Sequence, residues 1–317
     1  MRKGRGRLIK VYFVNGFLDA GKTSFIKELL KQNSFQIPGK TMLLLCEEGE
    51  EEYDEEILVS NNVTVVNIEN EEDFNPEHIM SIEKEIRPKR VIVEFNGMWN
   101  RKNIEFPWYW DDIVEVVLID GRTFEVYSKN MKSIVSEQVR NAAMAIFNRC
   151  DNVGTKLAGF RRSVKAVNSY INIVFKDKDG EMNPRFDEDL PYDIHGEKIE
   201  LTDDTFGIFY LDAMEDVERY LGKEVSLVGM VMKKSKEQLN TCIIGRFAMT
   251  CCAEDLSLFG FICDYESDEQ VELDEWVNIT AIVDKDYAEK FDIWYPVLNV
   301  VSLKRCDKPK KEVIEIL

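Results

Sequence analysis

Short apolar runs alternate with helix-periodic segments over the first half of the chain, from Lys10 to about Phe175. Short apolar runs are typical of strands buried on both faces, and apolar residues spaced three and four apart indicate helices with one buried side. The alternation predicts an α/β domain with a doubly wound, mostly parallel sheet. The expected strands are Lys10–Asn15, Thr41–Cys46, Val63–Asn67, Arg90–Phe95, Val114–Ile119, Ala143–Phe147 and Ile171–Phe175, and the expected helices are Thr23–Gln32, Glu77–Ile86, Ser133–Ala142 and Gly159–Tyr170.

The pattern changes after Phe175. Scattered charges, glycines and prolines predict a linker or irregular arm over residues 176–211, which separates a domain at 1–175 from one at 212–317. A helix is expected at Asp212–Leu221, and the β-patterned runs after it predict a small five-stranded, OB-like β-barrel. These runs are Glu224–Lys233, Cys242–Cys252, Leu258–Asp264, Trp276–Asp284 and Tyr295–Leu303.

Charge and composition narrow the class of protein. The 317 residues include 41 lysines and arginines and 59 aspartates and glutamates, so the net charge is −18, which argues against nucleic acid as a partner. Apolar runs stay well short of the roughly 18 residues of a membrane span, and we expect a cytoplasmic protein with no direct membrane insertion. The seven cysteines, an odd number, favour reduced thiols over a disulfide framework.

The residues Gly16–Thr23 fit the phosphate-binding pattern G-x-x-x-x-G-K-[ST], between an expected strand and an expected helix. The alternative is an ordinary glycine turn. In the nucleotide-binding interpretation, the backbone N–H groups hold the phosphates, Lys22 reaches the β- and γ-phosphates, and Thr23 binds Mg²⁺, so these two side chains are the expected catalytic groups. The phosphate-binding residues would be Gly16, Asp19, Ala20, Gly21, Lys22, Thr23 and Ser24.

Two further segments fit the same site. The expected strand at Arg90–Phe95 carries Glu94 near its end, which could hold Mg²⁺ directly or through water, and Gly97 could bring its N–H to a γ-phosphate. Asn148-Arg149-Cys150-Asp151 is similar to the guanine-reading pattern N-K-x-D. The Asp151 carboxylate would accept from guanine N1–H and N2–H₂, which adenine lacks. A plain turn is the alternative for this second segment.

These motifs together resemble the P-loop GTPases of metallocentre assembly, and within them the CobW-like nucleotide-binding domain (CobW/HypB/UreG), over about Lys10 to Phe175. The resemblance implies GTP and GDP with Mg²⁺ as cofactors and slow GTP hydrolysis. It also implies that Glu47 lies in the switch region as a further Mg²⁺ residue beside Glu94. The segments that carry it are GFLDAGKTS (Gly16–Ser24), CEEGE (Cys46–Glu50), EFNG (Glu94–Gly97), VVLIDG (Val116–Gly121) and NRCD (Asn148–Asp151).

The chain departs from that family at three places. Asp19 replaces a glycine of the phosphate loop, and Arg149 replaces the lysine of the guanine motif. The family's C-x-C-C metal site should follow the strand Val63–Asn67, but the residues there are acidic and contain no thiol. The acidic run Glu47–Glu56 holds eight acids in ten residues, which predicts a solvated, extended loop, with a role at the nucleotide as the alternative.

Adjacent cysteines, Cys251 and Cys252, close a β-patterned run in the second domain. One buried and one partly exposed thiol is the plain interpretation, because neighbouring strand residues face opposite ways. The alternative is a thiolate site for Zn²⁺ or another transition metal, or a redox-responsive pair. The surrounding GRF-x-M-x-CC string resembles the C-terminal β domain of an uncharacterised family often paired with predicted permeases.

The leading hypothesis is a GTP-binding protein with slow GTPase activity that acts as a nucleotide-dependent switch in metal homeostasis or metal-cofactor delivery. Its partners would be GTP, a metalloprotein client or a membrane permease, and a second copy of the chain in a homodimer. One alternative is a non-hydrolysing scaffold that senses or carries metal on a degenerate GTPase domain. Another alternative is an ATP-using P-loop enzyme. It would be preferred if Asp151→Ala left the preference between GTP and ATP unchanged.

Overall fold

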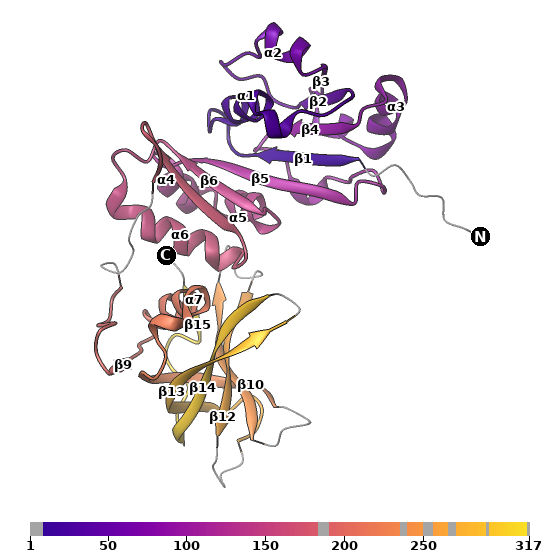
Figure 1. Cartoon of the computed structure of the whole chain (residues 1–317). Coiled ribbons are helices and arrows are strands. Elements are labelled where there is room, and N and C mark those ends of the chain that lie inside the picture. Colours follow the sequence, from indigo (N-terminus) through magenta and orange to yellow (C-terminus); the bar gives the residue numbers. More distant parts are fainter. Residues whose placement is uncertain are drawn as a thin grey trace, which may run out of the picture. The chain divides into compact units, whose positions relative to one another are not determined.

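The computed structural model describes residues 9–182, 190–234, 240–249, 256–265, 271–289 and 292–315. The chain divides into two compact units, Met1–Phe160 with Tyr170–Pro184, and Arg161–Ser169 with Arg185–Leu317. Each unit has its own sheet, and the two are described separately (Figure 1).

The first unit is built on an eight-stranded sheet of order β3-β2-β4-β1-β5-β6-β7-β8. Neighbouring strands are parallel except for β8, which runs antiparallel to β7. This arrangement confirms the expected α/β class with a mostly parallel sheet. The strands are β1 Lys10–Asn15, β2 Thr41–Leu45, β3 Val63–Asn67, β4 Arg90–Glu94, β5 Asp112–Asp120, β6 Met144–Asn148, β7 Asn172–Asp177 and β8 Gly180–Met182.

Helices connect these strands. They are α1 Lys22–Lys31, α2 Glu55–Ser60, α3 Pro76–Ile86, α4 Phe124–Asn130, α5 Lys132–Arg140 and α6 Leu157–Val167. The sequence pattern missed α2 and α4 because helices of six and seven residues are too short to show a periodic apolar stripe. The expected acidic loop therefore ends where α2 begins, at Glu55.

Successive residues of the central strands serve two separate cores. Val11 and Phe13 of β1 pack with Ile79 of α3 on one face of the sheet. Val14 of β1 packs with Ile26 of α1 on the other face. Because side chains alternate along a strand, burial on both faces explains the continuous apolar runs of the sequence.

The parallel arrangement gathers polar strand ends at one edge. Most of these strands end on polar residues, and the ends that matter for the site are Asn15 of β1, Glu94 of β4, Asp120 of β5 and Asn148 of β6. The loop that joins β1 to α1 starts at this same edge. Ligands of open α/β sheets bind beyond the carboxyl ends of the strands, so the fold brings the candidate residues together there.

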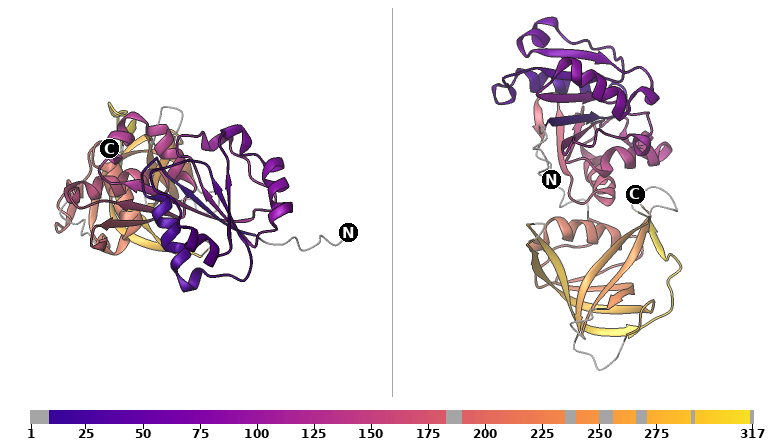
Figure 2. Two further views of the ribbon diagram at one scale, coloured as in Figure 1. Left: turned by 90° about the horizontal axis from the view of Figure 1, so that it is seen from above. Right: turned by 90° about the vertical axis from the view of Figure 1, so that its right-hand side faces the viewer.

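The second unit contains a seven-stranded sheet of order β15-β11-β12-β14-β13-β10-β9, with an additional pairing between β10 and β11. All five expected strands are present, and β9 and β15 add to them. Figure 2 shows the long strands wrapping around a common interior. The strands are β9 Lys198–Glu200, β10 Glu224–Lys234, β11 Thr241–Met249, β12 Leu256–Tyr265, β13 Trp276–Ala288, β14 Ile293–Arg305 and β15 Val313–Glu315.

The helix expected at Asp212–Leu221 was wrong in position, since α7 spans Phe206–Glu215. Its residues are mostly apolar and are buried on several sides, including Phe206, Phe209 and Ala213. A helix that is apolar nearly all round shows no one-sided stripe, so the pattern did not reveal it. The irregular arm expected at 176–211 also contains β8, β9 and the start of α7.

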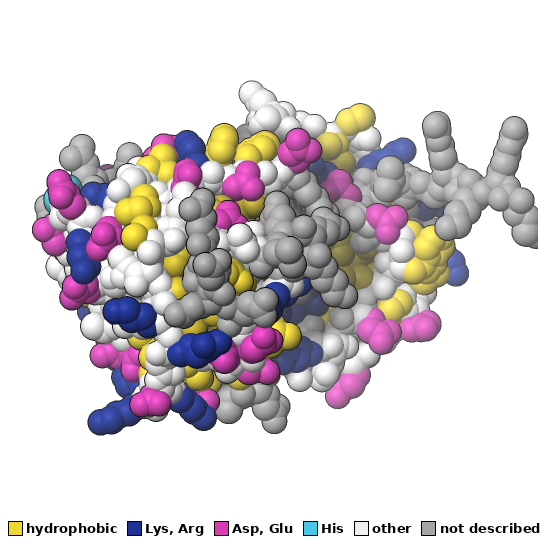
Figure 3. All heavy atoms as spheres, turned by 90° about the horizontal axis from the view of Figure 1, so that it is seen from below, with side chains coloured by type: hydrophobic (Ala, Val, Ile, Leu, Met, Phe, Trp, Pro, Cys, Tyr) yellow, Lys and Arg dark blue, Asp and Glu magenta, His cyan; other side chains and the backbone are white. Residues whose placement is uncertain are grey.

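On the face seen in Figure 3, positively and negatively charged side chains are interspersed with apolar ones. Between β4 and β5, Trp108 is 80% exposed, whereas Trp110 is buried. Among the helices of the described ranges, none has the length and apolar character needed to span a membrane.

Candidate nucleotide-binding site

The loop between β1 and α1 has a backbone that only certain residues can adopt. Gly16 and Gly21 have φ angles of 137° and 97°. A Cβ atom on Gly16 would lie 2.3 Å from the Leu118 carbonyl oxygen, and one on Gly21 would lie 2.9 Å from Asn148 Nδ2. Both backbone angles favour glycine, and at Gly16 the close approach to the Leu118 backbone leaves no space for a Cβ.

Asp19 also has a left-handed backbone, with φ at 59°. Aspartate tolerates this conformation better than most residues, although glycine adopts it without strain. The Asp19 side chain is exposed. The carboxylate that replaces the family's glycine thus adds a negative charge at the outer side of the loop.

The loop and the start of α1 present free backbone donors. The backbone N–H groups of Gly21, Lys22 and Thr23 donate to no acceptor among the residues that the structure describes. The first N–H groups of a helix have no partner inside the helix, and they carry the positive end of its dipole. This geometry suits an anion such as a phosphate group.

Lys22 lies across the loop and is only 4% exposed. Its Nζ donates to the carbonyl oxygens of Gly16 at 2.8 Å and Phe17 at 2.9 Å. It also forms an ion pair with Glu47, with 2.5 Å between Nζ and Oε2. The structure thus joins Lys22 to Glu47 of the acidic run.

Thr23 and Glu94 converge at the end of β4. The Thr23 hydroxyl donates to Glu94 Oε1 at 2.7 Å, and the Tyr53 hydroxyl donates to the other carboxylate oxygen. Burial raises the pKa of Glu94, and the hydrogen bonds from Tyr53 and Thr23 oppose that shift. Burial also raises the pKa of Tyr53. A hydroxyl and a carboxylate side by side are the hard oxygen ligands that Mg²⁺ prefers, so these residues fit that ion.

Gly97 lies directly against the phosphate loop. A Cβ atom on Gly97 would be 2.3 Å from the Gly16 carbonyl oxygen. The Gly97 carbonyl accepts a hydrogen bond from Gln138 Nε2 at 2.9 Å. Gln138 is buried on α5. It could not be predicted from the sequence, because a single polar residue on a helix forms no motif. Gln138 positions the segment that follows β4.

The Asn148–Asp151 segment is tied to the phosphate loop by two side chains. Asn148 Nδ2 donates to the Ala20 carbonyl oxygen at 2.9 Å, and Arg149 Nη1 donates to the Asp19 carbonyl oxygen at 2.7 Å. Asp151 remains exposed, and one carboxylate oxygen accepts from the Lys178 N–H at 3.1 Å. The structure therefore brings the expected base-reading segment beside the expected phosphate-binding segment.

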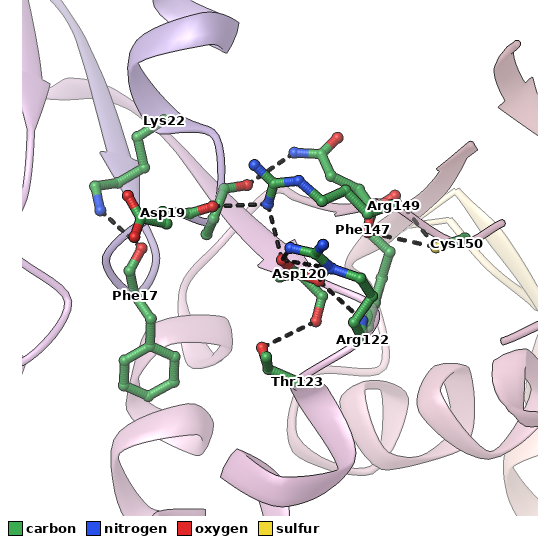
Figure 4. A network of polar contacts seen from close by, with 11 residues as sticks. Phe17, Asp19, Lys22, Asp120, Arg122, Thr123, Phe147, Arg149 and Cys150 are labelled. Atoms are coloured by element: carbon green, nitrogen blue, oxygen red, sulfur yellow. Dashed lines mark hydrogen bonds and ion pairs between the residues drawn. The ribbon is translucent and has the colours of Figure 1, made fainter. Parts of the chain in front are cut away.

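Asp120, at the end of β5, connects two arginines of this site. Its carboxylate forms ion pairs with Arg149 at 2.8 Å and with Arg122 at 2.7 Å (Figure 4). Burial tends to raise the pKa of Asp120, but the hydrogen bonds and charge of Arg122, with help from Arg149, lower it overall. In the sequence, Asp120 stands out only as part of the VVLIDG segment. Its role in holding Arg149 appears only in the structure.

Thiols contribute little to the described part of this site. Cys46 is buried next to Glu47, and its burial raises its pKa. Within the described ranges, there is no group of three or more histidine, cysteine, aspartate or glutamate residues that could hold a metal ion. Cys242 and Cys263 are buried cross-strand neighbours in the second unit. Cys251 and Cys252, the expected transition-metal ligands, lie outside the described residues.

Two curated proteins match parts of the chain. Zinc-regulated GTPase metalloprotein activator 1 of Schizosaccharomyces pombe is 24% identical over 195 residues, which cover 52% of this chain and 45% of that protein. The UPF0703 protein YcgQ of Bacillus subtilis is 28% identical over 116 residues, which cover 35% of this chain and 39% of that protein. The chain thus spans less than half the length of either relative.

A solved structure is also similar to this chain. The crystal structure of the hydrogenase maturation factor HypB from Archaeoglobus fulgidus has a TM-score of 0.41 and 17% sequence identity. The similarity covers 55% of this chain and 84% of that one.

Family models match both units of the sequence. The CobW/HypB/UreG nucleotide-binding domain matches residues 10–175, and the DUF1980 C-terminal domain matches residues 178–314. The first match covers just over half of the 317 residues and contains all the motifs of the candidate nucleotide site. Both matches confirm the resemblances drawn from the sequence. This chain therefore belongs to the CobW/HypB/UreG nucleotide-binding family and joins that domain to a DUF1980 C-terminal domain.

Proposed function

We propose that this protein binds GTP with Mg²⁺, hydrolyses it slowly, and uses its nucleotide state as a switch in metal handling. The observation that carries the proposal is the pair of hydrogen bonds from Asn148 and Arg149 to the carbonyl oxygens of Ala20 and Asp19. They join the proposed phosphate-binding loop to the proposed base-reading segment, which supports a single nucleotide site. A glycine turn or an isolated N-x-x-D turn would not require this contact.

In the proposed complex, the phosphates lie against the N–H groups at the start of α1. Lys22 stabilises the charge of the β- and γ-phosphates, and Gly97 offers its N–H to the γ-phosphate. Thr23 and Glu94 hold Mg²⁺, with Glu47 as a further candidate. Bound Mg²⁺ would neutralise part of the phosphate charge. We expect slow hydrolysis because these residues supply positioning and charge stabilisation.

Asp151 carries the proposed choice of guanine over adenine. One of its oxygens accepts from the Lys178 N–H, but an ionised carboxylate has lone pairs for further donors. The guanine N1–H and N2–H₂ groups would bind there, whereas adenine has no donor at those positions. Arg149 would line one side of the base, and Asp120 holds its guanidinium in place.

The metal-related part of the proposal draws on the family and on one relative. The S. pombe relative is named a zinc-regulated GTPase metalloprotein activator, which favours a metalloprotein client. Residues 67–73 lack the thiols of the family's metal site, so Zn²⁺ would have to bind elsewhere. Cys251 and Cys252 are the remaining candidates for a transition metal. A membrane permease partner, a homodimer and a cytoplasmic location remain parts of the proposal.

We also propose an OB-like barrel for the second unit. Five strands pair in the order β10, β11, β12, β14 and β13. Because β13 also pairs with β10, these pairings form a closed circuit. Only β12 and β14 are parallel within this circuit. Closure protects the edges of these five strands, which supports a barrel.

Calorimetry with GTP, GDP and ATP, each with Mg²⁺, tests the proposed function. The intact chain should bind GTP and GDP, and Lys22→Ala should abolish that binding because the cation at the phosphates is lost. Asp151→Ala should remove the preference for GTP over ATP, and an unchanged preference would favour an ATP-using enzyme. Binding of GTP without release of inorganic phosphate would favour the non-hydrolysing scaffold.

A further inference from the structure

Residues 47–54, here called the acidic strap, lie over the phosphate loop. Lysine has three N–H donors on its ammonium group. All three donors of Lys22 have acceptors, namely the carbonyl oxygens of Gly16 and Phe17 and the carboxylate of Glu47. The Glu47 side chain is only 11% exposed, so the ion pair is partly shielded from water. A phosphate oxygen that bonds to Lys22 must replace at least one of these acceptors.

A second carboxylate of the strap binds the next turn of the same helix. Glu51 accepts a hydrogen bond from the Ser24 hydroxyl, and this bond lowers its pKa. Lys27, further along α1, forms ion pairs with Glu51 and Asp54, each at 3.1 Å. The strap is thus attached to α1 by its carboxylates at three residues, Lys22, Ser24 and Lys27.

A third contact reaches the candidate Mg²⁺ residues. The Tyr53 hydroxyl donates to one oxygen of Glu94, while the Thr23 hydroxyl donates to the other. Both oxygens of this carboxylate are therefore engaged, one of them by the strap. An ion that binds Thr23 and Glu94 would have to replace or share these hydrogen bonds.

The strap contains acidic residues that take no part in these contacts. Glu48 and Glu50 are exposed, and neither makes a hydrogen bond or ion pair with any residue of the described ranges. The contacts with the phosphate loop therefore belong to Glu47 and Glu51 and are not shared by every acid of the run. This division allows specific contacts to be separated from the general effect of negative charge.

We propose that the acidic strap is an intramolecular competitor of the nucleotide, whose carboxylates occupy the phosphate-binding side chains until GTP or GDP displaces them. The proposal rests on the proposed GTP-binding function and adds a regulatory element to that site. In the nucleotide-free protein, Glu47 neutralises Lys22 and Glu51 engages Ser24. Bound phosphates take over Lys22, and the strap loses its attachment to that residue.

The competition connects nucleotide binding to the conformation of the strap. The protein binds nucleotide more tightly when the strap is released from the phosphate loop. By linkage, bound nucleotide favours the released strap to the same extent. A partner that binds the released strap would therefore promote nucleotide binding. The nucleotide affinity of the chain alone is reduced by the fraction of molecules in which the strap is attached.

Titration of the full chain with a fluorescent GDP analogue in the presence of Mg²⁺ tests the competition. Glu47→Gln/Glu51→Gln removes the two competing charges, and we expect its affinity to rise about tenfold if the strap is attached in roughly nine molecules out of ten. Glu48→Gln/Glu50→Gln removes the same charge from the same segment without touching the loop, and its affinity should change by less than about twofold.

Hydrogen exchange provides a measurement that needs no nucleotide. Lys22→Ala removes the attachment of the strap to Lys22, so the amide of Leu58, which donates to the Asp54 carbonyl oxygen where the strap enters α2, should exchange faster than in the wild type. GDP should produce the same increase in the wild-type chain and none in Lys22→Ala. Thermal unfolding of each variant checks that it is folded.

The outcomes separate the strap from the proposed function. Equal gains in affinity in both double variants would overturn the competitor proposal, because they would indicate a general effect of negative charge. Weaker binding by Glu47→Gln/Glu51→Gln would also overturn it, because it would indicate that these carboxylates act only in binding Mg²⁺. If the wild type binds GDP and Glu47→Gln/Glu51→Gln binds it with the same affinity, the competitor proposal is also overturned. The proposed function would remain intact. Failure of every variant to bind GDP or GTP would overturn both proposals.

Discussion

The side-chain amide of Asn148 donates to the carbonyl oxygen of Ala20 across 2.9 Å. Asn148 ends β6, and Ala20 belongs to the loop after β1, so the bond joins a strand end to a loop residue 128 positions away in the sequence. A Cβ atom on the neighbouring Gly21 would come within 2.9 Å of the same amide nitrogen. The proposed base-reading segment and the phosphate loop therefore depend on each other for their positions.

Asn148→Ala should weaken nucleotide binding about tenfold and lower the free energy of unfolding by about 1 kcal/mol, because it removes one part-buried hydrogen bond. Calorimetry with GDP and denaturant unfolding measure the two effects. Asn33→Ala, at an exposed position away from the site, is the matched control. Unaltered GDP affinity in Asn148→Ala would show that the contact does not position the site.

Gly97→Ala should abolish or strongly reduce nucleotide binding. The added Cβ would lie 2.3 Å from the Gly16 carbonyl oxygen and 2.8 Å from Gln138 Nε2, so the phosphate loop must shift. Gly154→Ala is the control, because a Cβ there would have no atom within 4 Å. GDP titration of both variants, together with thermal unfolding, distinguishes a displaced loop from an unfolded domain. Normal GDP affinity in Gly97→Ala would contradict the prediction.

Asp19→Gly should raise the affinity for GDP several-fold. It removes a negative charge beside the phosphates, and glycine adopts the left-handed backbone of this position without strain. The hydrogen bond from Arg149 goes to the backbone oxygen and remains possible. The free energy of unfolding should change by less than about 1 kcal/mol, because relief of strain and the greater freedom of glycine in the unfolded chain oppose each other.

The measurement for Asp19→Gly is a GDP titration at two salt concentrations, because the electrostatic part of the gain should shrink as salt rises. Asp19→Asn removes the charge but keeps a side chain that tolerates the left-handed backbone. It should therefore retain most of the gain. A decrease in affinity in both variants would indicate that the Asp19 carboxylate assists nucleotide binding.

Glu94 should make the protein, in the absence of nucleotide and Mg²⁺, less stable as the pH rises above 4.5, the ordinary pKa of a glutamate. Burial raises its pKa in the folded state, so the folded protein binds more protons than the unfolded chain between the two pKa values. Stability therefore falls with rising pH over that window. Glu94→Gln should remove this pH dependence. The variant should therefore become progressively more stable relative to the wild type as the pH rises from 4.5 towards neutrality.

Denaturant unfolding across that pH range, without nucleotide or Mg²⁺, measures the difference. The wild-type minus variant comparison cancels groups with the opposite sign, such as Asp120, whose pKa is lowered. A difference that does not vary with pH would contradict the prediction. The same variant should lose the Mg²⁺ dependence of GDP binding, since a glutamine oxygen is a weaker ligand for Mg²⁺ than a carboxylate.

The features that could be predicted well from the sequence depend on residues that are neighbours in the chain. The strands of the first unit are continuous apolar runs because both faces of the sheet are buried, and the loop at Gly16–Thr23 is readable because its glycines are required by the backbone itself. The helix α7 was misplaced for the opposite reason, since burial on several sides removed its one-sided pattern. The short α2 and α4 gave no periodic signal.

The sequence by itself determined the fold class of the first unit, the family and the residues that could meet a nucleotide, because each of these depends on residues close together in the chain. Only the tertiary structure decided which distant side chains meet. Glu47 reaches Lys22 across 25 positions, and Gln138 reaches Gly97 across 41. These contacts arise because parallel strands bring their carboxyl ends, and the loops that follow them, to one edge of the sheet, where separation along the chain no longer limits which residues interact.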